Sequence, residues 1–219
     1  MPKHILYMLR TSADKPDRVR VYWDGAALQA YAEARGDLSL NWLDLGALAC
    51  PGGENAGVVW IAPGDPATTV QLDADLAYER ALRAMGVDCR TSPGGGVETE
   101  CLRCGHGWRD MRVSSEMALA LAVLTDAVED AFDVAFVFAG ERALRAISAS
   151  LGRLFPAKRL GRVTFGPSLR LRLGAGTLVV RPSHLEAARL PPVVRTRGGA
   201  FIEQPAHWRS DAPPLIKSA

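Results

Sequence analysis

VRVYWDG, residues Val19–Gly25, is the stretch that decides the fold class of this 219-residue chain. Residues 19–23 are apolar, aromatic or β-branched apart from one arginine, which is typical of a strand buried on both faces of a parallel sheet. The Asp-Gly pair that follows is a turn signal. Residues 58–62 and 134–139 repeat this pattern, and residues 87–90 and 162–165 repeat it more weakly.

Helical patterns lie between these segments, at residues 26–34, 70–85, 116–128 and 142–154. In residues 70–85 the apolar side chains fall near one stripe with charges opposite, as in a helix that covers a sheet. The run Met117-Ala-Leu-Ala-Leu-Ala-Val-Leu124 is apolar on all sides, which predicts a helix buried on most of its surface. Strands that alternate with helices predict an α/β fold with right-handed crossovers.

The chain divides into three predicted parts: an N-terminal segment at 1–16, one α/β domain at 17–166, and a basic C-terminal extension at 167–219. Interruptions rich in Pro and Gly, within residues 44–56 and 92–113, indicate loops at an edge of the sheet. In the extension, residues 169–173 and 177–180 are expected to form a hairpin.

The charges balance overall but are distributed unevenly. There are 26 Lys and Arg against 24 Asp and Glu, for a formal net charge of +2. Residues 142–219 contain 14 of the bases and 3 of the acids, which leaves 12 bases and 21 acids in residues 1–141. This split indicates either an ordinary solvated surface or a C-terminal part that faces phosphates. In the second case, truncation after Gly166 is expected to weaken nucleic-acid binding.

Hydropathy and cysteine content favour a reducing compartment. The sequence has no apolar run of the roughly 18 residues that a membrane span requires and no signal-peptide pattern, so we expect a cytoplasmic protein without a membrane partner. The 4 Cys are then expected to be reduced. Cys101-Leu-Arg-Cys104 is half of a tetrahedral Zn²⁺ site, which Cys50, Cys89 or His106 would have to complete; a metal-free turn is the alternative.

Three carboxylates are expected at one edge of the sheet. Asp24 ends the first strand, Glu141 follows a later strand, and Glu116 opens the apolar helix behind Ser114 and Ser115. Ligands of open α/β sheets bind beyond the carboxyl ends of the strands. Each acid alone is explained as a turn or as part of a helix N-terminus capped by a serine. A cluster of all three predicts Mg²⁺ or Mn²⁺, since hard cations prefer oxygen ligands.

Other chemistries have little support in the sequence. It contains no P-loop, no G-x-S-x-G elbow and no G-x-G-x-x-G pattern. The 4 His, at positions 4, 106, 184 and 207, do not form an H-x-x-x-H arrangement. These absences argue against nucleotide-cofactor and serine-hydrolase functions.

The order of these features resembles the NYN family of PIN-like ribonucleases, also called LabA-like. The resemblance covers about residues 18–165 and rests on four stretches: Val19–Gly25, Cys101–Gly105 with Trp108, Leu119–Ala127 and Phe132–Gly140. It implies a PIN-like three-layer sandwich around a mostly parallel sheet. It also implies an acidic pocket that binds Mg²⁺ or Mn²⁺ and cleaves RNA.

By this resemblance, Asp24 matches the family's first aspartate, and Glu116 and Glu141 stand where the family has aspartates. The three are therefore the predicted catalytic and metal-binding residues. The chain replaces an asparagine and two further acids of the family pattern with alanine, at Ala27, Ala122 and Ala143. One cation held by the remaining carboxylates is expected rather than two.

Three functions stay open at this point. The first is an endoribonuclease in which Asp24, Glu116 and Glu141 hold a Mg²⁺ or Mn²⁺ that activates water. Arg142 and Arg145 would then contact RNA phosphates, unless they only form a solvated helix face. The second is a catalytically inactive domain that binds RNA, another protein or a second copy of itself, which the alanines favour. The third is an α/β domain for a small ligand unrelated to RNA.

Overall fold

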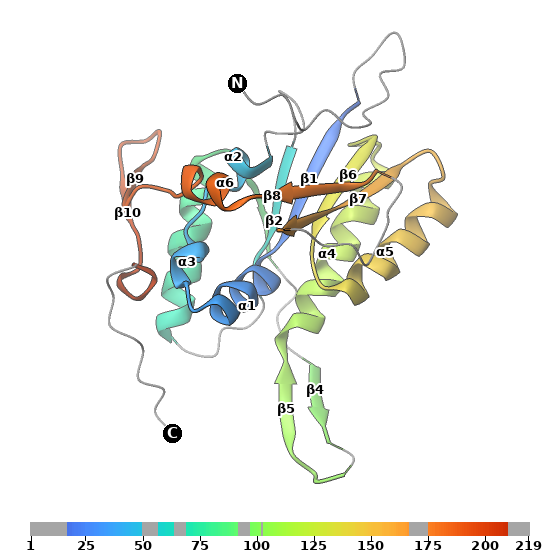
Figure 1. Cartoon of the computed structure of the whole chain (residues 1–219), viewed down its shortest axis with the longest axis horizontal. Helices are drawn as coiled ribbons and strands as arrows, with labels where there is room; N and C mark the ends of the chain where they lie inside the picture. Colours follow the sequence, from blue (N-terminus) through green and yellow to red (C-terminus); the bar gives the residue numbers. More distant parts are fainter. Residues whose placement is uncertain are drawn as a thin grey trace.

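A six-stranded sheet forms the centre of the computed structural model, which describes residues 17–49, 57–63, 69–91, 97–101, 103–166 and 175–209 (Figure 1). Its order is β3-β2-β1-β6-β7-β8, and each neighbouring pair is parallel. The strands are β1 (Val19–Asp24), β2 (Gly57–Ile61), β3 (Asp88–Arg90), β6 (Val134–Phe138), β7 (Arg159–Phe165) and β8 (Thr177–Val180). The predicted α/β class is confirmed, with β1 inside the sheet.

Helices cover both faces of the sheet and complete three layers (Figure 1). One face carries α1 (Gly25–Arg35), α2 (Leu45–Ala49), α3 (Thr69–Ala84) and α6 (Pro182–Ala187); the other carries α4 (Met111–Val128) and α5 (Glu141–Leu154). Val21 and Trp23 of β1 join the core on the first face, and Tyr22 joins the core under α4 and α5. None of the described helices is long and apolar enough to cross a membrane.

Three features differ from the sequence prediction. In α3, Leu72, Leu76 and Met85 are exposed, so most of the apolar stripe expected in residues 70–85 does not cover the sheet. Helix α4 begins at Met111 rather than at Glu116, so Ser114 and Ser115 lie inside the helix and do not cap it. Just before α4, β4 (Val97–Glu100) and β5 (Gly107–Asp110) pair antiparallel where a loop was predicted. Figure 1 shows this hairpin projecting away from the sheet.

The C-terminal part contributes to the same sheet and core. Strand β8 pairs in parallel with β7 and so belongs to the main sheet; the first arm of the predicted hairpin, residues 169–173, lies outside the described residues. Beyond α6, β9 (Val193–Arg195) and β10 (Phe201–Glu203) form a separate antiparallel pair. The predicted boundary at residue 166 therefore falls inside the sheet. Truncation after Gly166 would remove a strand, so it would test folding rather than nucleic-acid binding.

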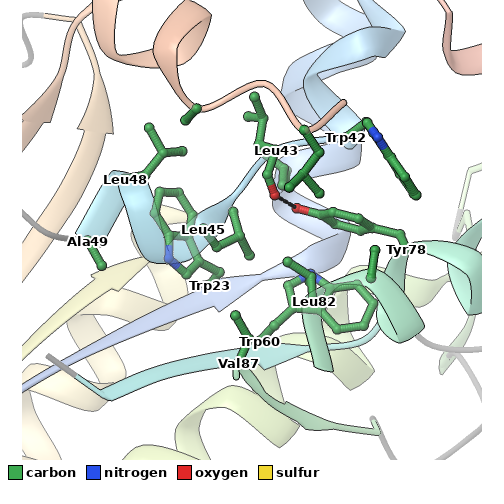
Figure 2. Packing of buried hydrophobic residues seen from close by; sticks show 14 of the residues in the cluster. Trp23, Trp42, Leu43, Leu45, Leu48, Ala49, Trp60, Tyr78, Leu82 and Val87 are labelled. Atoms are coloured by element: carbon green, nitrogen blue, oxygen red, sulfur yellow. Dashed lines mark hydrogen bonds between the residues drawn. The ribbon is translucent and has the colours of Figure 1, made fainter. Parts of the chain in front are cut away.

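A group of aromatic side chains closes the core between α3 and the C-terminal part (Figure 2). The Tyr78 hydroxyl donates to the Leu43 carbonyl at 2.9 Å, and the Trp42 indole donates to the Pro191 carbonyl at 2.9 Å. Trp208, in the short helix η3 (Ala206–Trp208), packs with its ring centroid 6.5 Å from that of Trp42. These contacts bind the last described segment to the domain.

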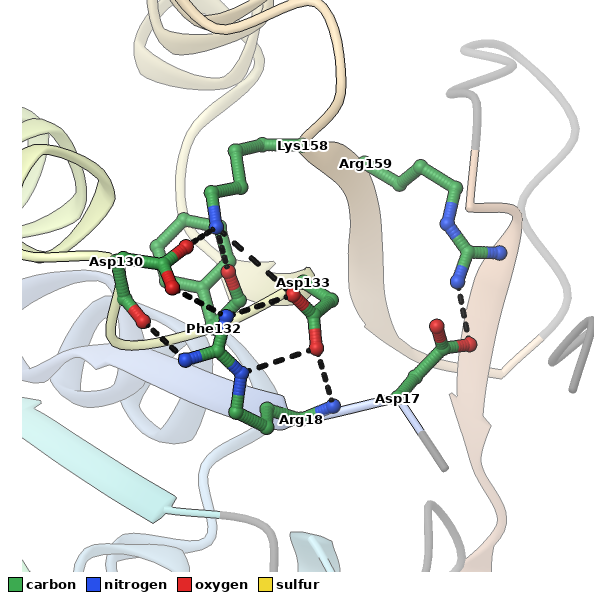
Figure 3. Close-up of polar contacts among 7 residues, drawn as sticks. All are labelled: Asp17, Arg18, Asp130, Phe132, Asp133, Lys158 and Arg159. Carbon is green, nitrogen blue, oxygen red and sulfur yellow. Dashed lines mark hydrogen bonds and ion pairs between the residues drawn. The ribbon is translucent and has the colours of Figure 1, made fainter. Parts of the chain in front are cut away.

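Ion pairs neutralise the edge of the sheet where β1, β6 and β7 begin (Figure 3). Arg18 Nη2 lies 2.8 Å from Asp133 Oδ1 and 2.9 Å from Asp130 Oδ2, and Lys158 also pairs with Asp130. The Arg18 guanidinium holds the pKa of Asp133 well below its usual range. Asp130 and Asp133 at this edge are thus paired with bases.

Candidate functional site

Asp24 lies where the interior strand β1 ends and α1 begins. Its carboxylate caps α1, because Oδ1 accepts hydrogen bonds from the amides of Ala26 at 3.0 Å and Ala27 at 3.3 Å. A Cβ on Gly25 would lie 2.7 Å from the Ile61 carbonyl oxygen, so the tight connection requires glycine. The Asp-Gly pair therefore forms a turn and a cap, as the sequence indicated, and buries Asp24 to 1% exposure.

Ser115 is the residue of this site that sequence reasoning misplaced. It was predicted as a cap of α4, but it lies within the helix and is fully buried. Its hydroxyl donates to Asp24 Oδ1 at 2.7 Å and joins α4 to the end of β1. A buried serine in an apolar helix was the available signal, since such a hydroxyl requires a partner.

Glu116 and Glu141 each pair with an arginine of α5. Glu116 Oε2 accepts from Arg142 Nε at 3.1 Å and from Nη2 at 2.7 Å, and its side chain is 18% exposed. Arg145 donates to Glu141 Oε1 at 2.6 Å, and both side chains are largely exposed. The Glu116 side chain packs against Gly140, where any Cβ would lie 2.8 Å from Glu116 Oε1, so a larger residue there would displace the carboxylate.

These residues surround one cleft of about 620 Å³, here named the strand-end cleft. It is lined by Asp24, Ala27, Ala30, Tyr31, Glu116, Phe138, Ala139, Gly140, Glu141 and Arg142. The structure thus brings the three predicted acids and Arg142 to one cavity, whereas Arg145 is not among its lining residues. Tyr31 and Phe138 give the cleft an aromatic wall, backed by Phe165 with its ring centroid 4.4 Å from that of Tyr31.

Burial raises the pKa of Asp24 to about 6, against the opposing effect of the hydrogen bonds from Ser115 and the two amides. The negative charge of Glu116 raises this pKa further. No cationic side chain among the described residues pairs with Asp24. The carboxylate is therefore ionised at neutral pH at a cost to folding.

Asp126 shows how this chain treats a buried carboxylate with a structural role. It is also 1% exposed, but Arg90 Nη2 lies 3.0 Å from Oδ1, Arg20 forms a second ion pair, and the Tyr22 hydroxyl donates at 2.7 Å. Two guanidinium groups thus compensate its charge. Asp24 lacks this compensation and faces a cleft, which is the arrangement expected of a carboxylate kept for binding or chemistry.

The acids of the strand-end cleft fit one divalent cation better than a larger metal centre. No group of three or more His, Cys, Asp or Glu side chains in the described ranges is arranged to hold a metal. Asp24 and Glu116 remain as neighbouring oxygen donors that repel each other, and one or two carboxylates suffice for Mg²⁺, which keeps several waters. The ion pair with Arg142 occupies Oε2 of Glu116 in this state.

The three alanines that depart from the family pattern lie in different surroundings. Ala27 lines the strand-end cleft, so a polar side chain would fit there. Ala122 belongs to the core between α4 and the sheet, and Ala143 is also buried. Carboxylates at the two buried positions would need partners that this core does not supply.

The Cys pair lies in the turn of the β4–β5 hairpin. The Gly105 amide donates to the Cys101 carbonyl at 2.8 Å, and Gly105 adopts a positive φ of 68°. Hydrogen bonds from the Arg103 backbone and from Cys104 lower the pKa of Cys101. Cys89 is buried beside α3, and Cys50 lies outside the described residues. His106, the remaining predicted ligand, accepts from the Cys101 amide through its carbonyl at 2.9 Å. No three His, Cys, Asp or Glu side chains in the part of the chain that the structure covers are arranged to complete the predicted Zn²⁺ site.

Comparisons with known proteins do not assign a family. The sequence matches no family model and no curated protein. Among solved structures, the crystal structure of a protein of unknown function from Vibrio parahaemolyticus RIMD 2210633 is similar, with a TM-score of 0.46 and 13% identity. The match covers 69% of this chain and 83% of that chain.

Proposed function

We propose that this protein binds RNA in the strand-end cleft and hydrolyses a phosphodiester bond with one Mg²⁺ or Mn²⁺ held by Asp24 and Glu116. The supporting observation is Asp24, a buried acid without a cationic partner among the described residues, which lines a cleft at the carboxyl end of an interior strand. The ordered motifs of the sequence point to the same chemistry. Glu141 stays at the rim in this proposal, because it is exposed and pairs with Arg145.

The residues around Asp24 have distinct tasks in this proposal. Ser115 and the first amides of α1 fix the orientation of the carboxylate. When bound, the cation would lower the pKa of a bound water and offset negative charge on the phosphate. Arg142, once released from Glu116, can donate to a phosphate oxygen. The aromatic side of Tyr31 offers a surface for a base or ribose.

The second candidate is a catalytically inactive domain that binds RNA without cleaving it. The observation that favours it is the ion pair between Arg142 and Glu116, because a guanidinium there already neutralises the carboxylate that the cation would use. The two candidates differ in one property: an active site gains a divalent cation, whereas the inactive domain keeps the ion pair.

Cleavage of a labelled single-stranded RNA in Mn²⁺ at pH 8 tests the proposal. The wild type should cleave the RNA. The cleavage rate of Asp24→Asn should fall to background, because the change removes the charged ligand but keeps a hydrogen-bond acceptor at Oδ1. Activity should also fall as the pH is lowered, because protons compete with the cation for the Asp24 carboxylate, whose pKa burial raises.

Asp75→Asn is the matched control for this assay. Burial also raises the pKa of Asp75 to about 6, but this carboxylate accepts from Gln29 and Gln71 and is not part of the cleft lining. It should cleave like the wild type. Equal activity of Asp24→Asn and the wild type would remove the proposed site.

Arg142→Gln should strengthen Mn²⁺ binding about two- to fivefold, because it frees Glu116 from an exposed ion pair worth up to about 1 kcal/mol. The same change should weaken RNA binding. Calorimetric titration of the wild type and of Arg142→Gln with Mn²⁺ measures the effect. Arg145→Gln is the control, because it disturbs the pair with Glu141 and leaves Glu116 paired. If neither the wild type nor Arg142→Gln binds Mn²⁺, the inactive candidate replaces the active one.

A further inference from the structure

A second cavity lies on the other side of the molecule from the strand-end cleft. It has a volume of about 570 Å³ and lies between the last turn of α3 and the turn that joins β9 to β10. The α3 end precedes β3, so this cavity is near the edge where the parallel strands begin, opposite the edge that carries Asp24. Its polar lining is contributed mainly by Arg80, Arg83 and Arg197. We name it the arginine pocket.

The positive charge of the arginine pocket is only partly neutralised. Arg83 pairs with Glu79 at 2.6 Å and also donates to the Cys89 carbonyl at 2.9 Å. Arg80 and Arg197 are exposed and have no acidic partner among the described residues. Two unpaired guanidinium groups on facing elements attract an anion and suit the geometry of phosphate oxygens.

Phe201 adds an aromatic surface beside these arginines. Its side chain lines the pocket and is 69% exposed, whereas the next residue, Ile202, is buried and anchors β10 to the core. The guanidinium of Arg195, directly across the ladder, lies 6.0 Å from the Phe201 ring centroid. Arg195 therefore contacts part of the ring, and the 69% exposure of Phe201 leaves the rest of its surface available to a ligand.

The turn that carries Arg197 is fixed before any ligand binds. The Thr196 amide donates to the Ala200 carbonyl at 2.8 Å, and the Ala200 amide donates back to the Thr196 hydroxyl at 3.1 Å. Gly199 adopts a φ of 84°, which a side chain would disfavour. A preformed turn lowers the entropy lost on binding.

We propose that the arginine pocket is a second binding site for single-stranded RNA, in which a base stacks on Phe201 and the flanking phosphates contact Arg80 and Arg197. An exposed ring between cations is the combination that non-specific single-strand binding uses. We favour RNA over an acidic polypeptide because each nucleotide carries both a planar base for Phe201 and a phosphate for the guanidinium groups. The site anchors RNA away from the strand-end cleft and does not depend on cleavage there.

Fluorescence anisotropy of a labelled oligouridylate of about 15 nucleotides, in EDTA, tests this site. Phe201→Ala should lower the affinity about tenfold, and Phe201→Trp should restore it. Arg80→Ala with Arg197→Ala should reduce the slope of log affinity against log salt by about 0.7 for each phosphate that the variant no longer binds. Arg153→Ala, an exposed arginine of α5, is the control and should bind like the wild type.

Three outcomes would overturn the inference. One is wild-type affinity in both Phe201→Ala and the double arginine variant. Another is an equal loss in Arg153→Ala, which would indicate general charge attraction. The third is binding of polyglutamate at least as tight as that of the oligouridylate at equal salt, which would show that the base contributes nothing. Because EDTA removes cleavage, failure here leaves the strand-end cleft untouched, and the double variant should still cleave at saturating RNA if that cleft is active.

Discussion

Asp24→Asn is expected to stabilise the folded protein by about 2–3 kcal/mol at pH 8 in EDTA. In the wild type, burial raises the pKa of Asp24 to about 6 from an ordinary value of 3.8, so folding must retain a charged carboxylate in a poorly solvated place. Asparagine keeps the oxygen that accepts from Ser115 and the first amides of α1, and it is as good a cap as aspartate. The change therefore removes the charge and keeps the hydrogen bonds.

The pH dependence has a definite sign. Since the folded pKa lies above the unfolded one, the folded state binds the proton more tightly, and stability is greatest below pH 4 as far as this group is concerned. The stabilisation that the bound proton on Asp24 gives to the folded state is lost as the pH rises through about 6. The wild type and Asp24→Asn should thus have similar free energies of unfolding near pH 4 and diverge up to about pH 7, with the variant more stable.

Urea unfolding at pH values from 4.5 to 8 measures this divergence. Asp75→Asn is again the useful comparison, because the pKa of Asp75 is also raised to about 6. Replacing Asp75 should leave unchanged the part of the pH dependence that comes from Asp24. An Asp24→Asn protein that is less stable than the wild type at pH 8 would contradict the argument. It would mean that a partner outside the described residues compensates the charge.

Much of the fold could be predicted because it depends on local pattern. The apolar runs that became β1, β2 and β6 are buried on both faces, and such runs between short turns are typical of interior parallel strands. The place of Asp24 was also predictable, since an acid after an interior strand lies at the carboxyl edge of a parallel sheet. The helix that contains Glu116 was predicted correctly in type, but it begins at Met111, and Met117 and Leu121 of its apolar run are exposed rather than buried.

The features that the sequence did not reveal depend on contacts between distant residues. Strand β8 is short and follows an interrupted stretch, and it is recognisable as a strand of the main sheet only because β7 pairs with it in parallel. The hydrogen bond from Ser115 to Asp24 joins residues 91 positions apart. Whether Arg142 would meet a phosphate or Glu116 was likewise not encoded locally, because the i, i+4 pairing that explains Arg145 with Glu141 does not apply to it.

Trp208→Ala should destabilise the protein by about 3–5 kcal/mol, the largest loss we expect from one substitution. The indole is 2% exposed and packs against Trp42 and Tyr78, with centroid distances of 6.5 and 6.0 Å. Its removal would leave a cavity among rigid rings, which collapse poorly around a void. Trp208→Phe should lose less, since it keeps an aromatic ring at this place, and Arg209→Ala should change stability little because Arg209 is exposed.

The number of transitions in the unfolding curve also tests whether the C-terminal part belongs to the domain. Because Trp208 and β8 belong to the same core as β1 and α3, the wild type and Trp208→Ala should each unfold in a single transition seen alike by fluorescence and circular dichroism. A separate early transition in the variant, with most of the helix signal retained, would show instead that the C-terminal part folds as an independent extension. In that case RNA binding at the arginine pocket would be lost with the early transition, because Arg197 and Phe201 lie in that part, whereas cleavage at Asp24 would persist.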